Sequence, residues 1–124
     1  MLWLHADSCN VDILAANAFP MGILPDMGNI APQKVPMQTG DVFALLTDGF
    51  YEWARADKER FGVERVVEVI ITNQQKNATA ILKAIRTAVE EFADTKQSDD
   101  LTAIIIKKSS GLASPTGFEP VLPA

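Results

Sequence analysis

Three aspartates border two short apolar segments of the chain. Asp48 comes at the end of the run VFALLT, residues 42–47, while Asp99 and Asp100 stand directly before the run LTAIII, residues 101–106. Both runs are too short for buried helices, and their composition is typical of buried strands. If these strands are antiparallel neighbours, the end of one meets the start of the other, and the three carboxylates lie at one edge of a sheet.

Carboxylates brought that close repel one another, so one of them takes up a proton unless a cation lies between them. A site made of oxygen ligands, with no histidine or thiol nearby, favours a hard ion such as Mg²⁺ or Mn²⁺. Such an ion lowers the pKa of bound water and supplies hydroxide at neutral pH. Spacing alone also allows a simpler interpretation, in which the Asp-Gly and Ser-Asp-Asp segments are only turns.

The bulk properties narrow the class of protein. A net charge of −5 with scattered lysines and arginines argues against a nucleic-acid partner. No run approaches the roughly 18 apolar residues of a membrane span, and the N-terminus has no signal-peptide pattern, so we expect no membrane partner. The single cysteine, Cys9, fits a reducing compartment, and the cytoplasm is the expected location. His5 lies four residues from Cys9 in an expected strand, which leaves a Cys-His dyad open, although such pairs usually come from separate segments.

Hydrophobic spacing predicts the other elements. A hairpin is expected from residues 1–4 and 11–16, and a proline- and glycine-rich loop from residues 19–36. Apolar residues recur at helical spacing over residues 63–71 and 81–92, with Asn77 as the N-cap of the second helix. Trp53 and Tyr51 could line a site or fill the core, and the core is favoured for Trp53. Two helices between strands predict an α+β layered domain.

Residues 40–62, GDVFALLTDGFYEWARADKERFG, resemble the metal-dependent protein phosphatase (PPM) family, in its bacterial sporulation and stress-response branch. The likeness consists of a Gly-Asp turn, an apolar strand, Thr47-Asp48-Gly49, an acid at Glu52 and Phe61-Gly62. Upstream, FPMGILPD is similar to the Pro-Leu-Gly segment of that branch, and downstream SDDLTAIIIK is similar to its closing Asp-Asp-x-Thr and strand. The resemblance covers roughly residues 1–108.

The resemblance implies a fold, a reaction and a partner. The fold would be a layered antiparallel β-sandwich flanked by helices. Asp48 and Asp99 would each ligate a divalent metal, Mg²⁺ or Mn²⁺, and Asp100 would occupy a neighbouring, more often supporting position. The reaction would be hydrolysis of phosphoserine or phosphothreonine by metal-activated water, at a site with two metals. The partner would be a phosphorylated regulatory protein of the anti-sigma-factor antagonist type.

The sequence also departs from the family. The full domain has an earlier half in which an Asp-x-x-Gly-His-Gly or similar segment supplies an aspartate that bridges the two metals, and no such segment occurs here. We therefore expect residues 1–108 to form only the second half of the domain, with residues 109–124 as a Ser-, Gly- and Pro-rich, disordered tail. The chain could be a fragment, a subunit completed by a homodimer or strand-swapped assembly, or a small module that binds without catalysis.

Overall fold

A four-stranded antiparallel sheet is the frame of the protein in the computed structural model, which describes residues 1–110. The strands lie in the order β2-β1-β3-β4. Their bounds are Leu2–Leu4 for β1, Val11–Ile13 for β2, Val42–Leu46 for β3 and Ala103–Lys107 for β4. Together with three helices, this sheet confirms the predicted α+β fold.

The first strand lies inside the sheet, between its hairpin partner and β3. β1 and β2 form the predicted hairpin, although β2 ends at Ile13 rather than at residue 16. On its other side β1 pairs with β3, so that Trp3 lies opposite Phe43. The side chains of Leu2 and Leu4 belong to the hydrophobic core and are almost fully buried.

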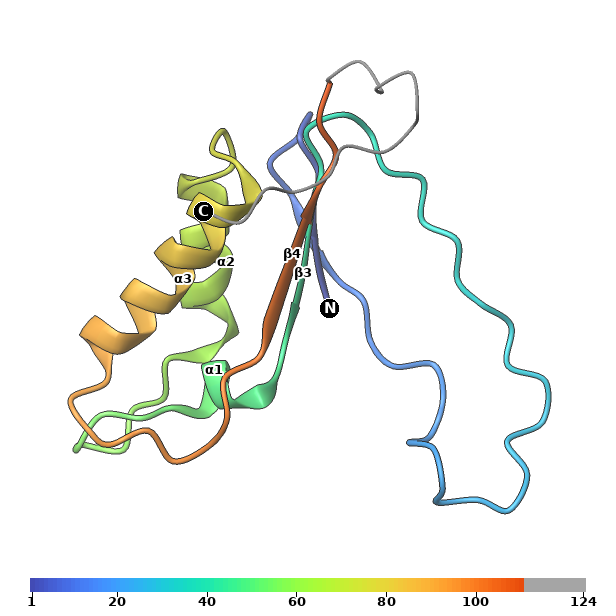
Figure 1. The fold of residues 1–124 in the computed structure, drawn as a ribbon, viewed down its shortest axis with the longest axis horizontal. Coiled ribbons are helices and arrows are strands. Elements are labelled where there is room, and N and C mark those ends of the chain that lie inside the picture. Colours follow the sequence, from blue (N-terminus) through green and yellow to red (C-terminus); the bar gives the residue numbers. More distant parts are fainter. Residues whose placement is uncertain (111–124) are drawn as a thin grey trace, which may run out of the picture.

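Two longer helices cover one face of the sheet (Figure 1). These are α2 (Gly62–Thr72) and α3 (Ala78–Phe92), at the predicted positions. The Asn77 side chain caps α3 as expected, since its Oδ1 accepts from the Ala80 amide at 2.8 Å. A short third helix, α1 (Asp48–Glu52), was not predicted.

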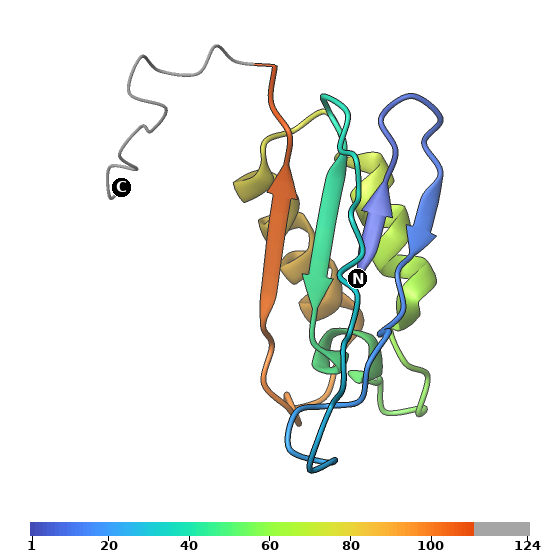
Figure 2. The same cartoon turned by 90° about the vertical axis from the view of Figure 1, so that its right-hand side faces the viewer.

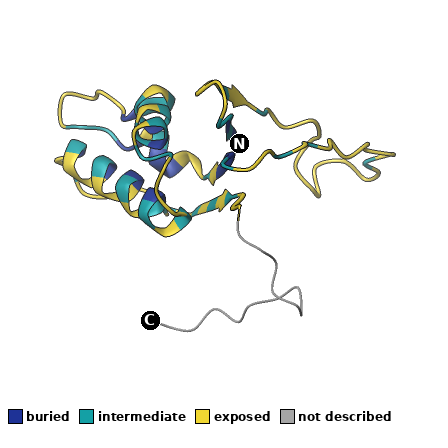
Figure 3. Cartoon of the chain, turned by 90° about the horizontal axis from the view of Figure 1, so that it is seen from above, coloured by how far each residue is buried: buried dark blue, intermediate teal, exposed yellow. Residues whose placement is uncertain are grey.

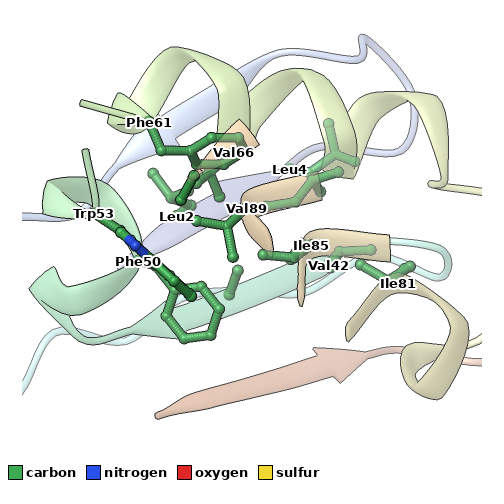
Figure 4. Close-up of a cluster of buried hydrophobic side chains, with 13 residues drawn as sticks. Leu2, Leu4, Val42, Phe50, Trp53, Phe61, Val66, Ile81, Ile85 and Val89 are labelled. Carbon is green, nitrogen blue, oxygen red and sulfur yellow. The ribbon is translucent and has the colours of Figure 1, made fainter. Parts of the chain in front are cut away.

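The hydrophobic core fills the space between this helical layer and the sheet. Figure 3 shows the buried residues gathered there, and Figure 4 shows how the side chains of α2 and α3 meet those of the sheet. Trp53 belongs to this core, as the sequence favoured, and is 9% exposed. The best-buried side chains share an aliphatic character: Leu4, Val42, Val66, Ile70, Ile81, Ile85 and Val89.

No helix covers the opposite face of the sheet, which is turned toward the viewer in Figure 2. The long connection of residues 14–39 extends from this side (Figure 1). We call this surface the open face; alternation along the strands gives it the side chains of Trp3, Phe43, Leu45, Ile104 and Ile106. Leu45, Ile104 and Ile106 are 37%, 54% and 48% exposed. The expectation that residues 42–47 form a buried strand therefore holds only for the first half of that segment.

Two further expectations concern the ends of the chain and the membrane. Most of the expected tail, residues 111–124, lies outside the described residues. Among residues 1–110, no helix combines the length and the apolar character that crossing a membrane requires.

Candidate active site

The junction of β3 and β4 brings the two aspartate-bearing segments together. The strands are antiparallel neighbours, which is the arrangement that places the three aspartates at one edge, and Leu46 lies opposite Ala103. The pairing continues for one more residue, because the Thr47 amide donates to the Thr102 carbonyl at 3.0 Å. Asp48 follows this paired segment of β3, and Asp99 and Asp100 precede the paired segment of β4. All three aspartates therefore lie at the same edge of the sheet, which we call the aspartate edge (Figure 1).

Thr47 joins the two segments through its hydroxyl. Its Oγ1 lies 3.3 Å from the carbonyl oxygen of Asp100 and accepts from the Thr102 amide at 3.1 Å. The hydroxyl makes no capping bond to α1, even though Thr47 is the N-cap residue of that helix. The threonine of the Thr-Asp-Gly motif therefore fixes the loop before β4 rather than the helix that follows it.

Gly49 allows the two segments to approach closely. A Cβ built on Gly49 would overlap the carbonyl oxygen of Asp100 and lie 3.2 Å from Cδ2 of Leu101. Gly49 is itself buried within α1. Any side chain here would push the loop of Asp99 and Asp100 away from Asp48, so the glycine of the Asp-Gly pair serves close packing and not only a turn.

The loop before β4 is held by local hydrogen bonds. Nε2 of Gln97 donates to the Asp99 carbonyl at 2.7 Å, and Oδ1 of Asp99 accepts from the Asp100 amide at 2.8 Å. Asp48, Asp99 and Asp100 are all exposed. Their carboxylates thus line a solvent-accessible edge, where water, an ion or a phosphate group can reach them.

The carboxylates alone do not complete a metal site. Within the described part of the chain, no three side chains of the His, Cys, Asp and Glu types are placed to hold one ion together. The donor chemistry suits Mg²⁺ or Mn²⁺, but the number of converging ligands falls short of the six oxygens that such ions take. Residues 1–110 therefore provide part of a ligand set, not a full one.

A second network lies at the other end of β3 and was missed by the sequence reasoning. Asp41 is 1% exposed, and its carboxylate accepts from the Ala6 and Gln38 amides, each at 2.9 Å, and from Nε1 of Trp3 at 3.1 Å. Burial raises the pKa of Asp41, but these donors together outweigh it and hold the pKa below its usual value. The sequence predicts a turn at this Gly-Asp pair, and in the structure its aspartate also anchors the start of β3.

The segment after α1 is fastened to the end of α3. Nε1 of Trp53 lies 3.2 Å from Oγ1 of Thr95, and that hydroxyl donates to the Ala54 carbonyl at 2.6 Å. The guanidinium groups of Arg55 and Arg65 lie 4.7 and 4.3 Å from the centre of the Phe92 ring. These contacts fix the turn that leaves the aspartate edge, and they make Trp53 a structural residue.

The Cys-His alternative finds no support in the geometry. Nε2 of His5 lies 2.7 Å from Oδ2 of Asp12, whereas Sγ of Cys9 lies 3.2 Å from Nε2 of Gln74. Cys9 is in the turn between β1 and β2 and not in a strand, with a φ of 56°. The strand alternation that would place both side chains on one face therefore ends before Cys9.

Comparison with known families gives the class of this protein. A family model described as stage II sporulation protein E (SpoIIE) matches residues 1–109, and that family is one of PPM-type sporulation phosphatase domains. The match spans most of the chain, and the protein belongs to the SpoIIE family. No curated protein and no solved structure gives a match.

Proposed function

We propose that the chain is the second half of a metal-dependent protein serine/threonine phosphatase domain. The observation that carries this proposal is the juxtaposition of Asp48 and the Asp99-Asp100 loop across the end of β3 and β4, in a member of a phosphatase family. Asp48 and Asp99 are the proposed ligands of Mg²⁺ or Mn²⁺, and Asp100 is a neighbouring, supporting carboxylate. When bound, the metal supplies hydroxide for attack on a phosphate ester.

The remaining ligands are proposed to come from outside residues 1–110. Two features support this: the described residues form no group of three potential ligands, and the open face exposes apolar side chains. In the layered β-sandwich that we propose, a second antiparallel sheet packs on the open face, and where another polypeptide supplies that sheet it also carries the bridging aspartate. That sheet would belong to another chain segment or to a second copy in a homodimer or strand-swapped assembly.

The proposed substrate is a phosphoserine or phosphothreonine of a regulatory protein, of the kind that antagonises an anti-sigma factor. The exposed position of all three carboxylates suits a protein substrate, because a folded partner can reach them without entering a deep cleft. The sequence has one cysteine, Cys9, whose thiol is exposed, so the chain cannot form an internal disulfide. This fits a reducing compartment, and the protein is proposed to act in the cytoplasm.

A second candidate function is a non-catalytic binding or dimerisation module derived from this fold. The incomplete ligand set and the exposed apolar residues of the open face favour it specifically. In this alternative the open face still binds a partner, but the protein does not hydrolyse phosphate esters.

Hydrolysis of a phosphoserine peptide in Mn²⁺ separates the two candidates. The phosphatase proposal expects phosphate release that stops when the metal is chelated, and its loss in Asp48→Asn and in Asp99→Asn. Asp7→Asn is the matched control, because Asp7 is also exposed but lies in the turn between β1 and β2. Full turnover in Asp48→Asn would contradict its role. A folded chain with no turnover, even in an assembly that contains the missing half of the domain, would favour the binding module.

A further inference from the structure

A cavity lies directly beside the loop that carries Asp99 and Asp100. Its volume is about 280 Å³, and its walls come from α1, α3, the loop before β4 and β4 itself. The residues that line it are Phe50, Leu82, Arg86, Gln97, Leu101 and Ala103. We propose that this cavity, here named the side pocket, receives an apolar side chain of the phosphorylated partner polypeptide; this inference rests on the proposed function.

The lining of the side pocket matches such an occupant. Phe50, Leu82, Leu101 and Ala103 offer apolar surface, while Arg86 offers N–H donors. A polypeptide presents this combination, since an apolar side chain is always accompanied by main-chain carbonyl acceptors. Sites for whole small-molecule ligands usually span ~300–1,000 Å³, so a cavity of about 280 Å³ is better matched to a single side chain.

Arg86 is available to a partner. Its side chain is 71% exposed, and its Nε donates to Oε1 of Glu90 at 2.9 Å, one turn along α3. An exposed pair of this kind contributes little to stability, so its exchange for a partner's carbonyl costs little. The guanidinium has further N–H groups beyond the one engaged with Glu90.

The side pocket is also joined to the proposed metal ligand. Gln97 lines the cavity and at the same time donates to the carbonyl oxygen of Asp99. Leu101 lines it from the other side of the aspartate pair and packs next to Gly49. A side chain bound in the pocket would therefore contact both ends of the Asp99-Asp100 loop. The pocket would then select partners by the residues near their phosphorylated residue, directly beside the proposed metal ligand.

The test is a leucine scan in nine-residue peptides centred on serine or phosphoserine. One leucine is moved through an otherwise alanine-rich background, and binding to the isotopically labelled chain is followed by backbone amide shifts. Burial of one leucine side chain should tighten binding about tenfold at one position of the scan relative to alanine. The accompanying shifts should centre on Leu82, Gln97 and Leu101.

Two variants with matched controls locate the effect. Ala103→Leu fills the pocket and should abolish the leucine preference, whereas Ala84→Leu adds the same volume on α3 outside the pocket and should keep it. Arg86→Gln should weaken binding several-fold, whereas Lys83→Gln removes the same charge from the same helix without effect. Because Arg86 is exposed, its variant remains informative even if Ala103→Leu fails to fold.

The outcomes separate this inference from the proposed function. Equal or absent binding across the scan, or a leucine preference that survives both Ala103→Leu and Arg86→Gln, would overturn the side pocket even if Mn²⁺-dependent hydrolysis is found. A leucine preference of unphosphorylated peptides that maps to the pocket, in a chain without hydrolysis, would support the pocket and count against catalysis.

Discussion

The backbones of Gly49 and Asp100 lie so close together that a Cβ on Gly49 would overlap the carbonyl oxygen of Asp100. This contact joins the start of α1 to the loop before β4. It explains why an aspartate at the end of a buried strand is followed by glycine, and it sets how near Asp48 lies to the Asp99-Asp100 loop. The aspartate edge thus depends on a residue with no side chain.

Substituting Gly49→Ala should destabilise the protein. The new methyl group meets backbone and not a flexible side-chain tip, so the β3–β4 end must shift, at a cost of about 1–3 kcal/mol. Urea unfolding of the variant would measure this cost. Thr87→Ala, an exposed substitution on α3, should change stability by less than about 0.5 kcal/mol. If the Gly49→Ala protein were as stable as the unmodified chain, the loop before β4 would be able to move aside without cost, which would contradict the role assigned to Gly49.

Substituting Asp41→Asn should weaken the anchor at the start of β3. An amide cannot accept all three hydrogen bonds as a carboxylate does, and the expected loss is about 1–3 kcal/mol at neutral pH. Asp7→Asn, in the exposed turn nearby, should have little effect. Equal stability of the two variants would contradict the role assigned to Asp41.

The lowered pKa of Asp41 also predicts a pH dependence. Its stabilising contribution is fully present above the unfolded-state pKa of ~3.9 and is lost as the pH falls through the lower folded-state pKa. The free energy of unfolding should therefore decrease in this acidic range, and the decrease should be smaller in Asp41→Asn. Urea unfolding at intervals of about half a pH unit between roughly pH 2 and 6 measures the free energy of unfolding of both proteins. Parallel curves for the two proteins would contradict the linkage.

The open face should drive association of the purified chain. Charged substitutions at Ile104 and Ile106 should shift the protein toward the monomer without lowering its stability, because both side chains are already about half exposed. Ile13→Glu is the matched control, since Ile13 is 66% exposed but lies opposite Leu2 on the helix-covered face. Sedimentation velocity reports the result. A monomer at all concentrations for the unmodified chain would contradict an interface on the open face.

The two longer helices were predictable because their signals are local. The apolar spacing over residues 63–71 and 81–92 and the cap at Asn77 correctly predicted α2 and α3. The pairing of β3 with β4 was one arrangement that the sequence allowed, and the structure has it. The likeness to PPM-type phosphatases from three short motifs agrees with the family match.

The features that were missed depend on contacts between distant segments. α1 has only five residues and contains a glycine, so no periodic pattern reveals it. The three donors of Asp41 come from Trp3, Ala6 and Gln38, of which two are more than 30 positions away. The place of β1 inside the sheet likewise depends on pairing with a strand that follows a long loop. A buried acid in a Gly-Asp pair has the same local sequence as an ordinary turn.

The most direct test of the central claim is a thermal melt of the chain with Mn²⁺, compared with Asp48→Asn, Asp99→Asn and Asp7→Asn. A metal that binds only the folded state raises the melting temperature by mass action, and at about tenfold its dissociation constant adds ~1.4 kcal/mol, or several degrees. We expect this rise in the unmodified chain and in Asp7→Asn, its reversal by chelation, and its loss in the other two variants. An equal rise in Asp48→Asn, or no rise beyond that in NaCl of the same ionic strength, would contradict a metal site at this edge.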